Sequence, residues 1–292
     1  MLGGTMSRNV HLVDAALVLR VHAPSVSPAR VRAERRLRHI LLDAGLTAAK
    51  PRSVTGEDLL WVAGRVAEVE QYVPHGAPVP TWNAYRSMFA TMSRVHGVLG
   101  DASVPRPVVS TYGPPGTLRR HLALLSRRPL NSTSRRHLQD VSTTLRAVLK
   151  SWVPARELPA STVHGDPRLE NLPTGHAGEP VVLDLGFAAR RPRIHDLAYA
   201  TAWILLGPND AGTPSTDAVD QIQHCISTYE EGPGGLTPVE RRAFDGYLAG
   251  VCLYQSTVAA HVEDPDAHLD QPGVRNMLET ARTVVARPRT FV

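Results

Sequence analysis

The sequence predicts an α+β fold of two lobes, a small β-rich lobe followed by a larger helical one. Near the N-terminus, the β-rich runs 8–14 and 16–22 predict a hairpin, and the runs 59–63 and 65–69 predict two further strands. Beyond residue 78 the apolar residues recur mainly at the spacing of amphipathic helices. Ligands often bind in a cleft between two such lobes, so we expect the functional site there.

Capping and breaking residues set the boundaries of these elements. Ser27 followed by Pro28 predicts the start of a helix, which we expect to end near Ala44 because Gly45 follows. The Pro- and Gly-rich segment 74–78 predicts a linker, so we place an N-terminal lobe at 1–73 and a hinge with the helical lobe at 74–292. The helices expected in the second lobe span 82–99, 116–125, 134–152, 197–206, 217–230, 238–262 and 274–286.

Composition indicates a soluble globular protein. Apolar residues make up 42% of the 292 residues and charged residues 20%, which argues against disorder. The longest apolar run, Leu197 to Leu206, is about half of the ~20 residues that a membrane span requires. The first residues lack the features of a signal peptide, and the two cysteines, Cys225 and Cys252, show no metal or disulfide spacing. We therefore expect a cytoplasmic protein without a membrane partner.

The net charge of +5 is unevenly distributed. From Thr201 to the C-terminus there are twelve acidic and six basic residues, a net charge of −6. The first 200 residues hold the remaining 15 acidic and 26 basic residues, a net charge of +11. Such a basic excess is compatible with nucleic-acid binding, but no zinc-ligand pattern, RNA-binding strand motif or basic zipper accompanies it. A nucleotide cleft and a solvated surface explain the charge at least as well.

The strongest chemical signal is the segment Val163 to Asn171, which contains His-Gly-Asp followed by an asparagine five residues after the aspartate. Asp184 follows the apolar strand Val181-Val182-Leu183, and Asp196 opens an apolar helix twelve residues later. Phosphoryl transfer requires a carboxylate that faces the acceptor hydroxyl and oxygen ligands for the metal that neutralises the phosphates. Asp166 has the first role in this interpretation, and Asn171 and Asp184 hold Mg²⁺. Gly186 permits a sharp turn beside the metal.

These motifs resemble the aminoglycoside phosphotransferase family and its choline-kinase-like and homoserine-kinase-like relatives. That family has His-Gly-Asp, asparagine five residues after the aspartate, Asp-x-Gly after a strand, and then Asp-Leu-Ala, and this sequence has each at the family's spacing. The resemblance implies a bilobal protein-kinase-like fold and an ATP- and Mg²⁺-dependent transfer of a phosphoryl group to an alcohol. It also implies that His164 braces the catalytic loop and that Asp196 accepts backbone N–H groups from it.

The resemblance extends to the N-terminal lobe. Gly3, Gly4 and Ser7 are similar to the family's nucleotide loop, whose backbone amides approach phosphates. Val18 and Arg20 share one face of a strand, as do the residues that cover adenine and reach the phosphates in related proteins. The family usually has lysine in place of Arg20, and guanidinium is not an equivalent phosphate ligand.

Other nucleotide-site residues follow from the same comparison. Glu34 lies on the apolar face of its predicted helix, where a carboxylate needs a partner, and we expect this partner to be Arg20. Adenine would meet backbone groups of Gln71 and Val73 in the hinge. The first strand of the family appears here only as Met1-Leu2, or not at all.

The acceptor is open to three interpretations. Glu263, Asp264 and Asp266 belong to the acidic C-terminal region and favour an amine-bearing small molecule, such as an antibiotic in resistance or natural-product biosynthesis. Arg190 and Arg191, in a basic segment that also contains Arg193, suit instead a Ser or Thr of a ribosomally made peptide that is phosphorylated before dehydration. Arg20 and the short N-terminus suit a catalytically silent nucleotide-binding scaffold. Arg168 is a further candidate for substrate binding.

Overall fold

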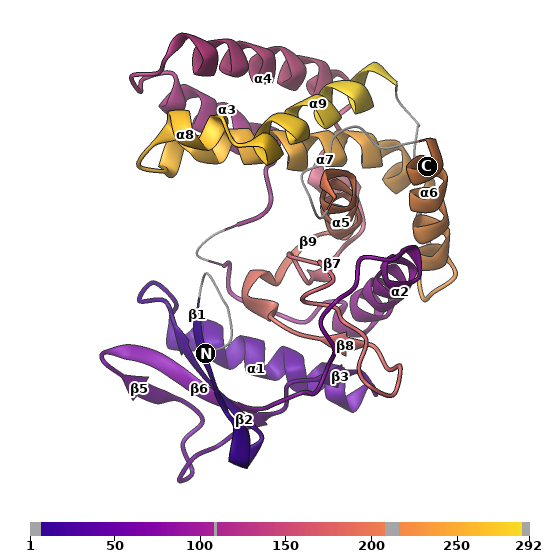
Figure 1. The fold of residues 1–292 in the computed structure, drawn as a ribbon. Coiled ribbons are helices and arrows are strands. Elements are labelled where there is room, and N and C mark those ends of the chain that lie inside the picture. Colours follow the sequence, from indigo (N-terminus) through magenta and orange to yellow (C-terminus); the bar gives the residue numbers. More distant parts are fainter. Residues whose placement is uncertain (1–6, 108–109, 208–215, 288–292) are drawn as a thin grey trace. The chain divides into compact units, whose positions relative to one another are not determined.

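The computed structural model describes residues 7–107, 110–207 and 216–287 (Figure 1). The chain forms two compact units, one from residues 1–110 and 160–191, the other from residues 111–159 and 192–292. The division predicted at residue 73 falls just after the last strand of the main sheet, but the first unit continues beyond it. A long helix and the segment that contains the predicted catalytic loop belong to the same unit as the sheet.

An antiparallel sheet forms the β-rich part of the first unit. The predicted hairpin is present, and its second strand pairs with β6, so that Arg20 lies opposite Glu68 and Val18 opposite Glu70. Alternation along β2 buries Val18 and Arg20 together on one face. The strands are β1 (Ser7–Leu12), β2 (Leu17–His22), β6 (Arg65–Gln71) and β4 (Pro51–Arg52) in spatial order, with β5 (Leu60–Val62) paired to β6.

Helix α1 (Pro28–Asp43) begins and ends as its capping residues predict. The Ser27 side chain accepts a hydrogen bond from the Arg30 N–H at 3.2 Å, Pro28 occupies the first turn, and Gly45 adopts a positive φ of 73°. The helix buries four charged side chains in addition to its apolar residues. Buried charges require partners, so these residues must pair with other groups of the unit.

Short pairings hold the loops of the first unit in place. Strand β7 (Ala160–Val163) pairs with β9 (Ala189–Pro192), and β3 (Thr47–Ala48) runs parallel to β8 (Val181–Val182). The Thr162 N–H donates to the Gly100 carbonyl at 2.8 Å, which ties β7 to the end of α2 (Trp82–Leu99). The loops between these strands, 164–180 and 183–188, therefore have both ends anchored in the same unit.

The second unit is helical. Its central helix, α7 (Pro238–Thr257), starts with a capping box formed by Thr237 and Glu240 and packs against four other helices. The predicted helix 238–262 is too long, because α7 ends at Thr257 and a 3₁₀ turn, Val258–His261, follows. The other helices are α3 (Pro115–Leu125), α4 (Ser132–Ser151), α5 (Ile194–Leu206), α6 (Thr216–Glu230), α8 (Pro265–Leu269) and α9 (Pro272–Ala286).

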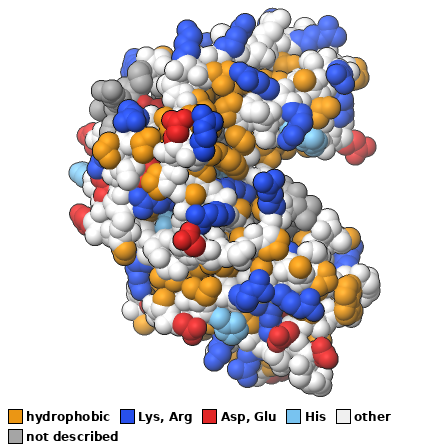
Figure 2. All heavy atoms as spheres, turned by 180° about the vertical axis from the view of Figure 1, so that it is seen from behind, with side chains coloured by type: hydrophobic (Ala, Val, Ile, Leu, Met, Phe, Trp, Pro, Cys, Tyr) orange, Lys and Arg blue, Asp and Glu red, His pale blue; other side chains and the backbone are white. Residues whose placement is uncertain are grey.

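Two surface properties concern the expected partners. Among the described residues, no helix combines the length and apolar character needed to cross a bilayer. On the face drawn in Figure 2, Lys and Arg side chains are spread among neutral and apolar ones rather than gathered into one patch.

Candidate active site

The loop that follows β7 is held in one conformation by its own residues. Gly165 has a φ of 85°, and a Cβ atom at this position would lie 2.2 Å from the Phe187 carbonyl oxygen, so only glycine fits. Asp166 and Asn171 are buried, with 4% and 8% exposure. The Asn171 amide donates at 2.9 Å to both the backbone oxygen and the carboxylate Oδ2 of Asp166. The carboxylate and the amide therefore form one unit.

His164 joins this loop to the end of β8. The imidazole is fully buried, and its Nε2 donates to the Leu183 carbonyl at 2.8 Å. Since Nε2 carries the proton, Nδ1 is the acceptor and receives the Asp166 N–H at 3.4 Å. The Leu183 N–H in turn donates to the Asn171 carbonyl at 2.8 Å. Asp166, Asn171 and Asp184, the residue after Leu183, are thus connected through two adjoining loops.

Asp184 occupies an unusual backbone position. Its φ of 48° is left-handed, and its Oδ1 accepts hydrogen bonds from the Gly186 N–H at 3.3 Å and from Arg20 Nη1 at 3.2 Å. Burial would raise the pKa of this carboxyl group, but Arg20, His164 and the Gly186 N–H together lower the pKa below its ordinary value. The side chain keeps 40% exposure. Asp184 is therefore an ionised carboxylate within reach of a ligand.

Arg20 bridges the sheet and this loop. It pairs with Glu70 of β6 at 3.3 Å as well as with Asp184. Burial lowers the pKa of the guanidinium, yet Glu70 and Asp184 outweigh burial and raise the pKa. A cavity of about 30 Å³, room for a water molecule or a small ion, lies beside Arg20. Its lining residues are Ser7, Arg20, His22, Val26, Arg30, Glu34, Pro107, Asp184, Gly186 and Phe187.

The pairing expected between Glu34 and Arg20 is wrong. Glu34 instead accepts a hydrogen bond from Arg30 Nε at 2.5 Å, one helical turn earlier on the same face of α1. Burial raises the pKa of Glu34, and Arg30 opposes this shift. Arg20 finds its carboxylate on the neighbouring strand because the register of β2 and β6 places Glu70 on the same face. The two arginines thus have separate carboxylate partners.

A buried charge network beneath the sheet was not predicted. Glu68 is fully buried and pairs with Arg38 and, at 3.2 Å, with His22. Burial would raise the pKa of Glu68, but Arg38 and His22 lower it well below its ordinary value. The sequence carried a signal for it: Arg30, Glu34 and Arg38 are spaced by four residues and share a helical face.

Some backbone groups of the hinge residues form hydrogen bonds within the protein. The Gln71 N–H donates to the Lys50 carbonyl at 2.8 Å, and the Val73 carbonyl accepts a hydrogen bond from His75 Nδ1 at 2.7 Å. His11 stacks on Tyr72 with ring centroids 4.0 Å apart. Adenine binding by backbone groups of Gln71 and Val73 stays a prediction.

The predicted nucleotide-loop residues Gly3 and Gly4 lie outside the described residues. Asp196 is fully buried in the first turn of α5, which begins at Ile194 rather than at Asp196 as expected, and it belongs to the second unit. The helix starts earlier because the Asp196 N–H already donates to the Arg193 carbonyl at 3.1 Å.

The basic segment 190–193 does not form one anion-binding surface. Arg190 is exposed and pairs with Asp101, whereas Arg191 is buried and donates to the Ser110 hydroxyl at 3.2 Å. Arg193 makes a two-pronged contact with Glu240 at 2.7 and 2.8 Å. Three adjacent arginines therefore have three different partners. Arg168 lies closer to the predicted chemistry, since its Nη2 donates to Asp166 Oδ2 at 3.2 Å.

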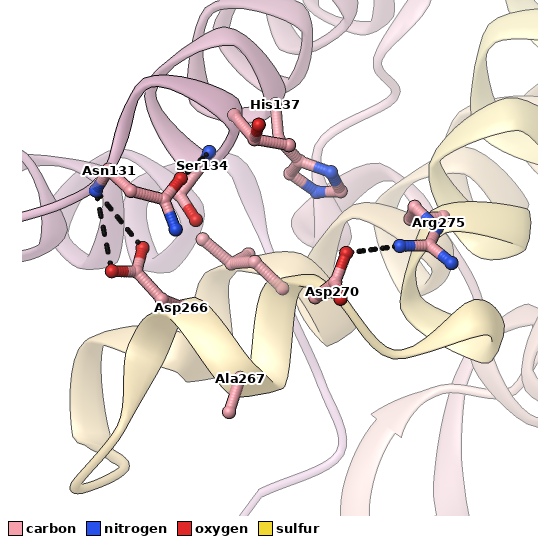
Figure 3. A pocket seen from close by; sticks show the side chains of 9 residues that line it. Asn131, Ser134, His137, Asp266, Ala267, Asp270 and Arg275 are labelled. Atoms are coloured by element: carbon pink, nitrogen blue, oxygen red, sulfur yellow. Dashed lines mark hydrogen bonds and ion pairs between the residues drawn. The ribbon is translucent and has the colours of Figure 1, made fainter.

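The predicted acidic acceptor residues have local structural contacts. Asp264 caps α8 by accepting the Ala267 N–H at 2.9 Å, and the Asp266 carboxylate accepts the Asn131 N–H at 3.3 Å. Glu263 contributes a backbone carbonyl to Arg128 at 2.9 Å. Asp266 also lines a cavity of about 340 Å³ in the second unit (Figure 3). Asp270 lies in the same cavity and pairs with Arg275.

Only a few described residues are suited to a divalent metal. The described part of the chain contains no group of three or more His, Cys, Asp or Glu side chains arranged for a metal ion. Mg²⁺ in phosphotransferases needs only one or two protein oxygens, because substrate phosphates and waters complete its shell. Asp184 supplies an ionised carboxylate, and the hydrogen bonds of the Asn171 NH₂ group leave its carbonyl oxygen available. These hard oxygen donors fit Mg²⁺.

The first unit thus holds a buried aspartate–asparagine pair, an ionised aspartate and an arginine, which are residue types that phosphotransferases use. The chain matches the profile of the phosphotransferase enzyme family (APH) over residues 2–224 and belongs to that family. It is an ATP-dependent O-phosphotransferase, as the motifs predicted. The predicted bilobal, protein-kinase-like α+β fold is also confirmed.

Solved structures show the same fold at low sequence identity. An amicoumacin kinase in complex with AMP-PNP, Ca²⁺ and its ligand is 15% identical, with a TM-score of 0.70, and the match covers 97% of this chain and 86% of that one. An aminoglycoside phosphotransferase from Alicyclobacillus acidocaldarius is 15% identical (TM-score 0.66; coverage 98% and 90%). A microcompartment-associated aminopropanol kinase is 13% identical (TM-score 0.66; coverage 92% and 84%). A comparison with curated proteins finds no match.

Proposed function

We propose that the protein transfers the γ-phosphate of ATP, with Mg²⁺, to a hydroxyl group of an amine-bearing small molecule. The observation that carries the proposal is the placement of Asp166, Asn171, Asp184 and Arg20 in one compact unit. This unit contains a carboxylate for the acceptor, oxygen ligands for a metal and a cation for phosphate. Phosphoryl transfer depends on positioning and charge stabilisation, and these are the groups it needs.

Asp166 receives and orients the acceptor hydroxyl in this proposal. Its Oδ2 is occupied by Asn171 and Arg168, which holds the carboxylate in a fixed direction. Its Oδ1 is buried and accepts no hydrogen bond from the described residues, although Arg168 Nε lies 3.1 Å away as a charge contact. The Asp166 carboxylate would accept the hydrogen bond of the acceptor hydroxyl and, as the phosphoryl group moves, its proton.

Asn171 and Asp184 would hold the metal, which neutralises phosphate charge when bound. Arg20 already covers Oδ1 of Asp184, so Oδ2 is the oxygen available to the metal. The amicoumacin kinase structure contains AMP-PNP and Ca²⁺, which supports nucleotide and divalent-metal binding here. The Arg20 guanidinium faces the small cavity beside Asp184, where a phosphate oxygen could approach it.

Charge and the names of similar proteins support an amine-bearing acceptor. Residues 201–292 carry a net charge of −6, and Asp266 and Asp270 line a cavity in the second unit. Two of the similar structures are named for aminoglycosides and aminopropanol, both amine-bearing alcohols. The peptide alternative rested on the arginines of segment 190–193, and their dispersed partners remove the observation that favoured it.

A direct test is a mass-spectrometric screen for the gain of one phosphoryl group across amine-bearing alcohols, neutral alcohols and Ser/Thr peptides. The Asp184→Asn variant serves as the inactive control. We expect products among the amine-bearing alcohols. Products found only among peptides would replace the small-molecule proposal, and ATP binding without turnover on any acceptor would favour the silent scaffold.

A further inference from the structure

We propose that Arg30 is a positioning residue that fixes the metal-binding loop after Asp184, and that Glu34 keeps its guanidinium in place. This inference rests on the proposed function, because the loop matters only if Asp184 holds the metal. Its physical basis is the geometry of α1 and of the turn Leu185–Phe187, both in the first unit. Glu34 was expected to pair with Arg20 in the nucleotide site. In this proposal it acts instead on the metal-binding loop, by holding Arg30.

Every donor of the Arg30 guanidinium has an acceptor. Nε donates to Glu34 at 2.5 Å, and Nη2 donates to the carbonyl oxygens of Leu185 at 2.9 Å and Gly186 at 3.1 Å. Nη1 donates to the Ala188 carbonyl at 2.8 Å and to the Pro105 carbonyl. Guanidinium has five N–H groups in a rigid fork, and here all five are used. The side chain is 3% exposed, so water does not compete for these bonds.

The loop needs such support because its backbone starts from a strained conformation. Asp184 adopts a left-handed φ of 48°, which is costly for a residue with a Cβ atom. The turn after it is a single short 3₁₀ turn, in which the Gly186 N–H donates to Asp184 Oδ1 at 3.3 Å and the Ala188 N–H donates to the Leu185 carbonyl at 3.0 Å. Three of the carbonyl oxygens that follow Asp184 accept hydrogen bonds from Arg30. Arg30 therefore fixes the backbone of this turn and, with it, the orientation of the Asp184 side chain.

Glu34 makes the burial of Arg30 possible. A lone buried guanidinium would be strongly unfavourable, and carbonyl oxygens satisfy its hydrogen bonds without cancelling its charge. Glu34 is 3% exposed and lies one helical turn from Arg30, so its carboxylate neutralises the charge and fixes Nε. Lysine in place of Arg30 would keep the charge but present three N–H groups from a single atom, which cannot span Glu34 and the separate loop carbonyls.

Arg35 offers a matched control on the same helix. It is also buried, at 6% exposure, and also pairs with carboxylates, Asp58 at 2.9 Å and Glu68 at 3.7 Å. Its backbone acceptor is the Arg52 carbonyl rather than any residue of the loop after Asp184. Removing Arg35 therefore deletes a buried, ion-paired guanidinium from the same helix without touching the loop.

The test compares Arg30→Met, Arg30→Lys and Arg35→Met by hydrogen exchange and mass spectrometry on the unliganded protein. We expect the amides of Gly186 and Ala188 to exchange about ten-fold faster or more in both Arg30 variants. In Arg35→Met the increase should fall near residues 52–58 and spare the loop. The Arg30 variants should also bind Mn²⁺ with AMP-PNP about ten-fold more weakly, as measured by electron paramagnetic resonance.

Loop exchange in Arg30→Lys at the wild-type rate would overturn the proposal, and so would equal loop exchange in Arg30→Met and Arg35→Met. Arg30→Lys keeps the test decisive if Arg30→Met does not fold. The exchange measurement needs no turnover, so it separates the two hypotheses. A loosened loop in a protein that phosphorylates no acceptor would contradict the proposed function while leaving the role of Arg30 intact.

Discussion

Replacing Asp166 by asparagine removes the proposed acceptor carboxylate while preserving its shape. Asn171 would still donate to the backbone carbonyl of residue 166 at 2.9 Å, and the new amide oxygen can replace Oδ2. The lost charge contact with Arg168, whose side chain is 37% exposed, contributes about 0–1 kcal/mol. We therefore expect the free energy of unfolding of Asp166→Asn to lie within about 1 kcal/mol of the wild-type value.

The effect on turnover should be much larger than the effect on folding. Loss of a positioned base lowers kcat by ~10²-fold or more, which corresponds to about 2.7 kcal/mol in the activation free energy. Nucleotide affinity should change little, because Asp166 does not line the cavity beside Arg20 and Asp184. Steady-state kinetics with the acceptor found in the screen, and calorimetric titration with AMP-PNP, measure the two quantities separately.

Asp58→Asn is the matched control for this experiment. Asp58 pairs with Arg35 but is 63% exposed and lies outside the proposed site, so kcat should keep its wild-type value. A correctly folded Asp166→Asn protein with a kcat near that of Asp58→Asn would refute the assignment of the loop 164–171. A loss of AMP-PNP affinity equal to the loss of kcat would show that Asp166 acts in nucleotide binding instead.

Three further predictions concern the metal, the buried charges and the acceptor. Asp184→Asn removes a charge from the metal site, so activity should collapse and the Mg²⁺ concentration for half-activation should rise; wild-type activity at low Mg²⁺ in a metal titration would contradict this. The pKa of Glu68 is lowered from 4.5 to about 2, because Arg38 and His22 outweigh burial, so its contribution to stability is present above pH 4.5 and is lost as the pH falls towards 2. Glu68→Gln should lower the free energy of unfolding at neutral pH by about 3–5 kcal/mol, as measured by urea unfolding. It should also weaken the dependence of this free energy on acid pH. Glu57 is exposed, so Glu57→Gln should change neither quantity. Replacing Glu263, Asp264 and Asp266 by Gln and Asn should raise the acceptor KM by about ten-fold, increasingly so at low salt, and leave the ATP KM unchanged. If the acceptor KM rises in the double variant Arg190→Gln, Arg191→Gln and not in the acidic triple variant, the acidic region is not the acceptor site.

Local sequence signals predicted most of the secondary structure. Ser27, Pro28 and Gly45 mark the ends of α1 correctly, because capping depends on residues a few positions apart. The short strands β3 and β4 escaped prediction. Each has two residues and forms only because a distant segment supplies its hydrogen-bonding partner, so no local pattern predicts it.

The candidate site likewise contains contacts that the sequence predicts and contacts that it does not. Asp166 and Asn171 lie five residues apart in one loop, so their association could be predicted from spacing alone. The partners of Arg20 could not, because Glu34, Glu68 and Glu70 are all acids within its reach and the choice depends on geometry. Arg30 was missed for the same reason, since three of its acceptors are backbone carbonyls more than 150 positions away in the chain.

The sequence by itself thus determined the family and the fold class, and it predicted the residues for the chemistry. It did so because these depend on residue type and short spacing. Only the tertiary structure decided which buried charges pair. The pairing of β2 with β6 places Glu70 on the same face as Arg20, and these two side chains pair, whereas the packing of α1 directs Arg30 to the loop that carries Asp184. A buried ion is stable only beside a counter-ion in favourable geometry, and that geometry exists only after the strands and the helix have packed.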